Sequence, residues 1–311
     1  MCPLRDGIRI IRYHGVVEAL VDPLLERNFH LLSDFRAHVR ALRRVPIMTL
    51  SELEATLASR SFPPEGAHVI TFDDGYANNL AACEILDGAR IPCAIFVSTG
   101  AVGRQQTNWT AELSLLVLHG DAEQIETHGT AWVLTDRELR EKAYHAIRRG
   151  FKVLPATRRR AAMNELRRQF PPGETHRLLR RFAAFQMLSW EEMAQLGGAG
   201  VEIGSHGVHH ELHHAQQPRA VRNTELSDSR AQLEGRLGHP CRAFAFPNGD
   251  FTTTSADEVD VAGYALAVTI ESGPVTPGTN PCLLPRVKAP VSPREFEAAL
   301  AGTGPWASVI R

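Results

Sequence analysis

Two adjacent aspartates follow an apolar stretch in the first third of the chain. The segment "HVITFDDGY", residues 68–76, places Asp73 and Asp74 directly after residues typical of a buried strand. Such carboxylates either cap the next helix or belong to a charged site, where one ligates a metal and the other accepts a proton. On an extended backbone the two side chains would point apart, so we expect them to have different roles.

A histidine-rich segment supplies a second group of potential ligands. The stretch "SHGVHHELHH", residues 205–214, contains five histidines, and a spacing of four joins His206 to His210, His209 to His213 and His210 to His214. Spacing alone therefore selects no pair, but position favours His206 and His210, because His206 ends an apolar stretch. Two imidazoles and one carboxylate suit a catalytic Zn²⁺ with one open position. The alternative is a surface loop that binds no metal.

Seven short apolar stretches must position these side chains. They are residues 8–14, 68–74, 93–99, 201–206, 242–248, 264–270 and 282–288. Most are apolar at nearly every position, which is typical of parallel strands buried on both faces. Segments with helical spacing lie between them, among them 51–60, where Ser51 and Glu54 have the spacing of a capping box. We therefore expect one α/β domain over residues 1–311, a complete or incomplete barrel.

One long segment interrupts this alternation. Residues 104–186 are expected to form a helical insertion between the third and fourth strands, with at most one short strand at 131–134. Within it, residues 137–181 contain 14 Lys or Arg against 4 acidic residues. We expect helix surfaces whose charges pair with acids elsewhere. The alternative is a basic flap that contacts an anionic substrate, a lipid head group or a partner.

Composition excludes several classes of protein. Of the 311 residues, 43% are hydrophobic and 22% are charged, as in globular proteins, and the net charge of −1 gives no general attraction to nucleic acid. No apolar stretch approaches the ~18–20 residues of a membrane span. The N-terminus has no signal-like apolar region, which favours a cytoplasmic protein. A misplaced gene start or a removed targeting segment would allow a secreted or membrane-associated protein instead. The five cysteines form no C-x-x-C pair, so we expect reduced, mostly buried thiols. Nothing in the sequence indicates an oligomeric state.

Polar residues occupy the carboxyl ends of the expected strands. They are His14 after the first strand, Asp73 and Asp74 after the second, His206 after the fourth, Pro247, Asn248 and Gly249 after the fifth, and Arg286 in the seventh. In an α/β barrel these ends share one face, which carries the active site. We therefore expect these side chains to converge, with the chemistry of a metal-dependent hydrolase.

Three of these motifs resemble those of the polysaccharide deacetylases, the carbohydrate esterase family 4 group with the NodB homology domain. "TFDDGY" at 71–76 is similar to the family's first motif, "SHGVHH" at 205–210 to the second, and "FAFPNG" at 244–249 to the third. "RYHGVV" near the N-terminus resembles a motif of one subgroup. The resemblance covers most of the chain outside the insertion. It implies a distorted (β/α)₇ barrel, which agrees with the number of expected strands.

The resemblance also implies roles for the matching residues. Asp73 would be the general base, and Asp74, His206 and His210 would ligate a divalent metal. Pro247, Asn248 and Gly249 would line the sugar site with Tyr76, and the Asn248 backbone N–H would donate to the oxyanion. Zn²⁺ is the metal expected first, although such ligands also accept Co²⁺, Mn²⁺ or Ni²⁺. The substrate would be an N-acetylated amino sugar of a polysaccharide, oligosaccharide or glycan precursor.

The chain departs from the family's pattern in three ways. Gly207 stands where Ser or Thr is usual, Ala245 stands where an Arg is usual, and the C-terminal Leu-x-His motif that supplies the general acid is missing. We expect Arg286 to replace the guanidinium and His14 to act as the acid, with an ordinary core histidine as the alternative for His14. Two other functions stay open: hydrolysis of another linear or cyclic amide, and glycan binding without turnover.

Overall fold

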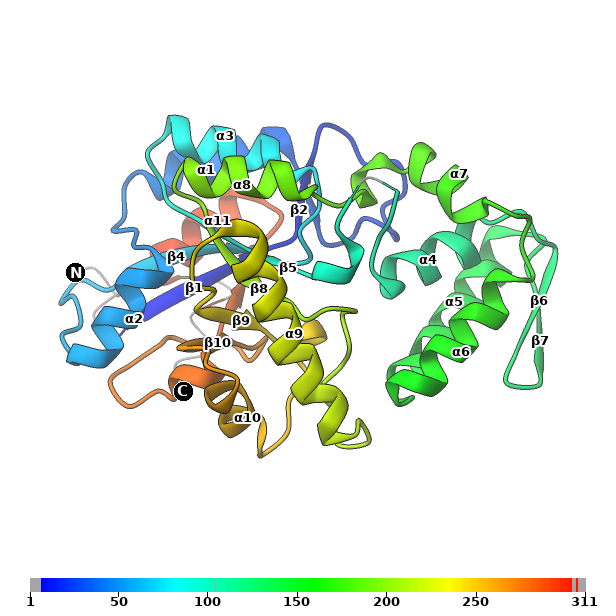
Figure 1. The fold of residues 1–311 in the computed structure, drawn as a ribbon. Coiled ribbons are helices and arrows are strands. Elements are labelled where there is room, and N and C mark those ends of the chain that lie inside the picture. Colours follow the sequence, from blue (N-terminus) through cyan, green and yellow to red (C-terminus); the bar gives the residue numbers. More distant parts are fainter. Residues whose placement is uncertain (1–6, 104, 304–305, 307–311) are drawn as a thin grey trace.

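The computed structural model describes residues 7–103, 105–303 and 306. Cys2 therefore lies outside the described residues. Seven parallel strands form one curled sheet in the order β10-β9-β8-β5-β4-β1-β11. They are β1 (Ile8–Tyr13), β4 (Ala67–Phe72), β5 (Ala94–Val97), β8 (Glu202–Ser205), β9 (Ala243–Ala245), β10 (Leu266–Val268) and β11 (Val287–Lys288). Every strand of this sheet overlaps one of the seven predicted stretches, and the fold is the distorted (β/α)₇ barrel that was expected (Figure 1).

The segment after β10 joins the two edges of the sheet. Leu284 pairs in parallel with Val268 of β10, and Val287 pairs with Ile11 of β1. The prediction of a strand over 282–288 was wrong in extent, because residues 281–283 turn into a 3₁₀ helix, η4 (Pro281–Leu283). Arg286 lies between the two pairings, where its side chain is buried.

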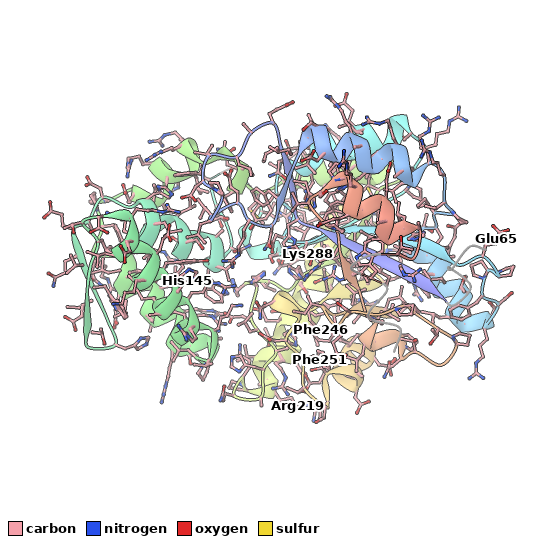
Figure 2. All side chains as sticks on the ribbon, turned by 180° about the vertical axis from the view of Figure 1, so that it is seen from behind. Glu65, His145, Arg219, Phe246, Phe251 and Lys288 are labelled. Atoms are coloured by element: carbon pink, nitrogen blue, oxygen red, sulfur yellow. The ribbon has the colours of Figure 1, made fainter. Side chains whose placement is uncertain are left out.

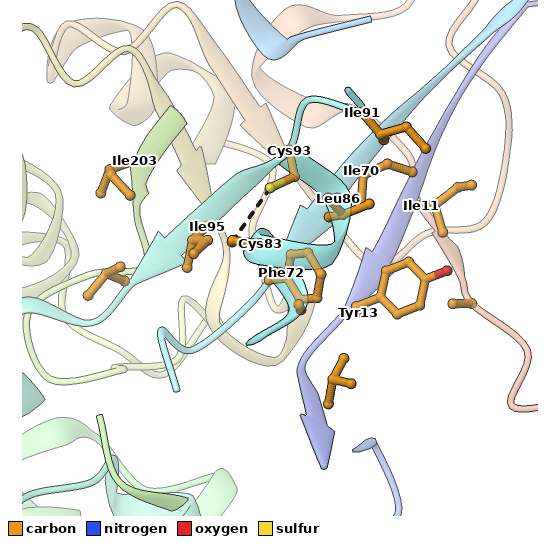
Figure 3. Packing of buried hydrophobic residues seen from close by; sticks show 14 of the residues in the cluster. Ile11, Tyr13, Ile70, Phe72, Cys83, Leu86, Ile91, Cys93, Ile95 and Ile203 are labelled. Carbon is orange, nitrogen blue, oxygen red and sulfur yellow. Dashed lines mark hydrogen bonds between the residues drawn. The ribbon is translucent and has the colours of Figure 1, made fainter. Parts of the chain in front are cut away.

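The strands are buried on both faces, which explains their continuous apolar runs. In β1, Ile8 and Ile10 belong to one apolar cluster, whereas Ile11 and Tyr13 belong to another on the opposite face. Figure 3 shows the second cluster, in which Ile11, Tyr13, Ile70 and Phe72 pack near helix α3 (Asn79–Gly88). Fully burying each such side chain contributes roughly 1.5–3 kcal/mol.

The remaining barrel helices surround the sheet. They are α1 (Leu32–Leu42), α2 (Leu50–Ser59), α8 (Trp190–Gly198), α9 (Arg219–Leu237), α10 (Ser255–Val261) and α11 (Pro293–Leu300). Two three-residue strands, β2 (Gly15–Val17) and β3 (Phe29–Leu31), form a separate parallel pair that was not expected. Within the described ranges, every helix is too short or too polar to cross a bilayer. The four described cysteines, Cys83, Cys93, Cys241 and Cys282, are free and buried.

Helix α2 begins two residues earlier than its predicted capping box implies. Thr49 is the N-cap and forms the box with Glu52. Ser51 and Glu54 have the same spacing, but they already lie in the helix, where Ser51 donates to Glu202 and Glu54 accepts from Arg242 at 2.8 Å. The two overlapping boxes in "TLSELE" are indistinguishable by spacing, and the extended backbone of Thr49 decides between them.

Within the expected insertion, residues 105–186 form a helical layer on one side of the barrel (Figure 1). It contains α4 (Trp109–His119), β6 (Gln124–Thr127), β7 (Thr130–Val133), α5 (Arg137–Lys152), α6 (Ala156–Arg167), α7 (Glu174–Arg181) and the 3₁₀ turn η2 (Ala183–Phe185). An antiparallel hairpin, β6 with β7, takes the place of the single short strand expected at 131–134. The apolar cluster of this layer includes Phe29 and Tyr76 of the barrel. The insertion is therefore packed against the barrel mouth.

Candidate active site

Asp74, His206 and His210 come together after β4 and β8. The Nε2 atoms of His206 and His210 lie 3.6 and 3.2 Å from Asp74 Oδ1. All three residues are buried, and one ligand atom from each lies within 4.8 Å of the others. His206 Nδ1 lies 2.7 Å from the carbonyl oxygen of Ala245, to which it donates, and this leaves Nε2 as the free acceptor. Metal-ligating histidines are held in this way, so the residues fit a divalent metal.

Burial also keeps His206 in the form that a metal requires. Desolvation lowers the pKa of His206 to about 4, although the charges of Asp73 and Asp74 oppose the change. The imidazole is therefore neutral at pH 7. For Asp74, burial favours the protonated form, but the hydrogen bond to His210 and the electrostatic effects of His210, His14 and His206 together lower the pKa to about 2. Neutral imidazoles and an ionised carboxylate are the ligand states that bind a cation.

Three residues of the site have a left-handed backbone. Asp74, His210 and Asn248 have φ values of +74°, +55° and +57°, and they are three of the six described non-glycine residues with positive φ. This conformation costs roughly 1–2 kcal/mol outside glycine, somewhat less for Asp and Asn, and is often found at functional sites. We predicted that the side chains of Asp73 and Asp74 point apart because both lie on an extended strand. The structure gives a different reason: β4 ends at Phe72, and the backbone of Asp74 is left-handed.

Arg286 binds the carboxylate of Asp73 with both terminal nitrogens. Nη1 and Nη2 donate to Oδ1 and Oδ2, each at 2.7 Å, and Nε donates to the carbonyl oxygen of Thr269 at 2.8 Å. Burial alone would raise the pKa of Asp73, but the charge of Arg286, assisted by His206, holds it well below its usual range. Asp73 is therefore an ionised carboxylate with a fixed orientation.

One cavity of about 740 Å³, open to solvent, unites most of the predicted site residues. Its lining includes Asp73, Asp74, His206, His210, His14, Tyr76, Asn248 and Gly249. Arg286 lies behind Asp73, and Pro247 is buried beside Asn248, so neither lines the cavity.

Burial shifts the pKa values of His14 and Tyr76 in opposite directions. Burial lowers the pKa of His14 to about 4, so the ring is neutral at pH 7. Burial, followed by the charge of Asp74, raises the pKa of Tyr76 well above its usual value. The Tyr76 hydroxyl accepts a hydrogen bond from Asn108 Nδ2 at 3.4 Å. It therefore stays protonated, and its hydrogen bond to Asp74 contributes to the raised pKa.

A buried glutamate on α9 holds the histidine loop in place. Glu225 accepts hydrogen bonds from the backbone N–H groups of Val208 and His209, both at 2.8 Å. A Cβ on Gly207, which has a φ of +79°, would lie 2.8 Å from Glu225 Oε2. The glycine therefore makes room for the carboxylate, which anchors the loop where a Ser or Thr hydroxyl was expected. No local pattern around Glu225 indicated this contact.

Replacing Glu225 with alanine is expected to weaken metal binding by roughly 10–100-fold, because the loop that presents His206 and His210 loses two hydrogen bonds to Oε2 of Glu225. Glu225→Gln, which keeps one acceptor oxygen, should lose less. Calorimetric titration with Zn²⁺ measures the affinity. Asp228→Ala removes an exposed acid from the same helix and is the matched control. Equal affinities for the Glu225→Ala and Asp228→Ala proteins would contradict the anchoring role.

Several lining residues were missed by sequence reasoning. Arg12 and Arg27 come from the barrel, and Ser114, Tyr144 and Arg148 come from α4 and α5 of the insertion. The sequence did indicate Arg12, because it is a charged residue in an apolar strand. It lies two positions before His14 and hence on the same face of that strand. The insertion residues had no such signal, because only the packing of the insertion brings them to the cavity.

Comparisons with known proteins agree with this fold. The polysaccharide deacetylase family profile matches residues 61–267. Similar solved structures include IcaB from Ammonifex degensii, at 22% identity over 97% of both chains and a TM-score of 0.62. They also include the Streptococcus pyogenes deacetylase PplD in complex with acetate, at 17% identity over 93% of this chain and 95% of that chain, with a TM-score of 0.60. At these identities the likeness establishes the fold. Comparison with curated proteins gave no match.

Proposed function

The chain belongs to the polysaccharide deacetylase family, and we propose that it is a metal-dependent hydrolase that removes the N-acetyl group from an amino sugar of a glycan. One observation carries this proposal. A three-ligand cluster, Asp74, His206 and His210, shares a cavity with an ionised carboxylate, Asp73, that Arg286 holds in a fixed orientation. This combination provides a metal, a base and room for a substrate.

Asp74, His206 and His210 would hold the metal. Imidazole and carboxylate ligands favour Zn²⁺, and Co²⁺, Mn²⁺ or Ni²⁺ fit the same donors. When bound, the cation polarises the amide carbonyl as a Lewis acid and lowers the pKa of a water molecule.

The protein's own residues supply the proton transfers. Asp73 accepts the proton of the attacking water, and Arg286 keeps its oxygens aimed at that water. The backbone N–H of Asn248 donates to the oxyanion of the tetrahedral intermediate. His14 is neutral in the free site, so it must receive a proton before it can give one to the leaving amine. Acetate and a free amino sugar are the products.

The two main departures from the family pattern have counterparts in the structure. Arg286 contacts Asp73, although the usual arginine position is Ala245, and Glu225 holds the histidine loop, although Gly207 has no hydroxyl. A protein that only binds glycans has no need for an oriented base. These contacts therefore support catalysis over binding alone.

Acetate release tests the proposed activity. The metal-loaded protein is incubated with N-acetylglucosamine, its phosphorylated derivatives and N-acetylglucosamine oligomers, and acetate is measured by a coupled enzymatic assay. We expect release from at least one member of the panel. Release from none of them, by protein with one bound metal per chain, would contradict the deacetylase proposal. Tight binding of the oligomers without release would support the binding alternative.

Replacing Arg286 with glutamine is expected to move the acid limb of kcat/KM to higher pH, by roughly one unit or more. Asp73 must be ionised to act, so activity is lost as pH falls through its pKa. Arg286 lowers that pKa, and its removal therefore brings the loss at a higher pH. Arg286→Lys, which keeps the charge, should shift the limb less.

Stability is the control for this comparison. Removing Arg286 leaves Asp73 buried without its partner, a change that costs about 3–5 kcal/mol in similar pairs. The pH profiles are therefore measured below the melting temperature of each variant. Superimposable profiles for the wild type and the Arg286→Gln protein would show that this guanidinium does not set the ionisation of the base.

A further inference from the structure

The basic side chains of the insertion differ in their surroundings. Many have partners within the fold: Arg137 with Asp22, Arg159 with Glu211, Arg167 with Glu112, Arg177 with Glu174, and Arg140 with the carbonyl oxygens of Val117 and Ala122. Arg148 and Lys152, in the last turns of α5, differ from these. In the described part of the chain, neither forms an ion pair, and both are half-buried on the side of α5 that meets the barrel.

Arg148 lies in the lining of the catalytic cavity, and Lys152 lies beside its wall. Lys152 Nζ donates to Asn248 Oδ1, a residue of the cavity wall. Figure 2 shows that α5, where His145 is labelled, approaches the barrel side that carries Lys288. The insertion therefore contributes positive charge to the same space as the proposed metal ligands.

The barrel contributes further positive charge to the same cavity. Arg12, at the end of β1, and Arg27, before β3, line the cavity, and Lys288 of β11 is close to both. Arg12 Nε is buried and has no hydrogen-bond partner in the described residues. Burial, Arg148 and then Arg27 lower the pKa of Lys152 to about 8. These cations are therefore near enough to repel one another, which is unfavourable unless an anion joins them.

The acids of the cavity do not balance this charge. Asp73 and Asp74 both face Arg12, but Asp73 is already paired with Arg286, and Asp74 would be matched by the cation that it ligates. Among the described residues, Asp250 is the carboxylate that acts on Lys152. The acetate product carries a single charge, which is too little for five basic residues. A phosphate carries up to two charges and matches the fork of a guanidinium, so it fits this wall better than a carboxylate does.

We propose that the amino-sugar substrate carries a phosphate or diphosphate group, which Arg12, Arg27, Arg148 and Lys152 bind where the insertion meets the barrel. This inference rests on the proposed function, because it places the acetamido group of the same molecule at Asp74, His206 and His210. Nucleotide-linked and lipid-linked amino sugars share this phosphoryl chemistry. The helical insertion then selects the substrate, and neutral oligomers are poorer substrates.

Turnover on matched substrates tests the preference. N-acetylglucosamine 1-phosphate, UDP-N-acetylglucosamine and polyprenyl diphosphate-linked N-acetylglucosamine in detergent are compared with methyl N-acetylglucosaminide, which is neutral. We expect kcat/KM to be at least tenfold higher for the phosphorylated compounds and to fall with ionic strength. The best of the three identifies the source of the phosphoryl group. Equal values for neutral and phosphorylated sugars, or a preference for an N-acetylated oligomer containing uronic acid, would overturn the proposal.

Arg148→Gln should lower the ratio of phosphorylated to neutral turnover by about tenfold or more. The matched control is Arg149→Gln, which removes the exposed neighbouring charge that does not line the cavity. Melting temperatures of both variants establish that each is folded. Equal ratios for Arg148→Gln and Arg149→Gln would overturn the assignment of this wall.

A binding measurement separates this inference from the proposed activity. Glucosamine 1-phosphate and glucosamine have no acetyl group to lose, and calorimetry on metal-loaded protein gives their affinities without turnover. We expect tighter binding of the phosphorylated sugar to the wild type and to Arg149→Gln than to Arg148→Gln. Any contribution of the bound metal to the affinity for the phosphorylated sugar is the same in all three proteins, so it cancels when their affinities are compared. If Arg148→Gln alone binds the phosphorylated sugar weakly but no protein releases acetate, only the proposed function is contradicted. If acetate is released but the three proteins bind the phosphorylated sugar equally, only the phosphoryl site is contradicted.

Discussion

The Asp73→Asn protein is expected to release acetate with a kcat lower by roughly 10²–10⁴-fold, while its metal content stays at the wild-type level. Asparagine has nearly the same shape as aspartate, and its amide oxygen still accepts a hydrogen bond from Arg286. It has no carboxylate to accept the proton of the attacking water. The proposed ligands, Asp74, His206 and His210, are untouched. A large loss of kcat with intact metal is therefore the signature of a base.

Metal analysis by mass spectrometry and the initial rate of acetate release are measured on the same sample. Asp87→Asn is the control, since Asp87 is an exposed acid on α3, the helix that follows Asp73 and Asp74. Loss of metal together with activity would show that Asp73 is a ligand instead. More than a tenth of the wild-type rate in the Asp73→Asn protein would place the base elsewhere.

The fold could be predicted from sequence because its main signal is local. Strands such as β1 and β4 lie between two apolar layers, and this requires apolar residues at nearly every position. The weaker predictions concern short elements. β2 and β3 have three residues each, and β11 has two, so their pairing depends on neighbours far along the chain.

The site could be predicted in part for a similar reason. In a parallel barrel the carboxyl ends of the strands share one face, so position along the chain was enough to group His14, Asp74, His206 and Asn248. Residues that reach the site from other elements had no comparable signal in the sequence. Glu225 acts from the middle of α9 and Arg148 from α5, and both reach the site only through packing.

The histidine pair chosen from position can be tested within one loop. His206→Ala is expected to lose bound metal and to reduce acetate release to background, because it removes a ligand nitrogen that Ala245 keeps oriented. His209→Ala is the matched control: it removes the exposed imidazole of the same loop, outside the three-residue cluster, and should keep metal and activity. Spacing alone allowed His209 in a metal pair, so the two variants separate the alternatives.

Removing the metal from the wild type gives the complementary result. Chelation should abolish acetate release, and adding Zn²⁺, Co²⁺, Mn²⁺ or Ni²⁺ separately should restore it to extents that rank the metals at this donor set. The His206→Ala protein should not recover at the concentrations that restore the wild type, because two remaining ligands hold the ion too weakly. Full activity after chelation, or metal retained by His206→Ala but lost from His209→Ala, would show that the cation binds through a different set of side chains.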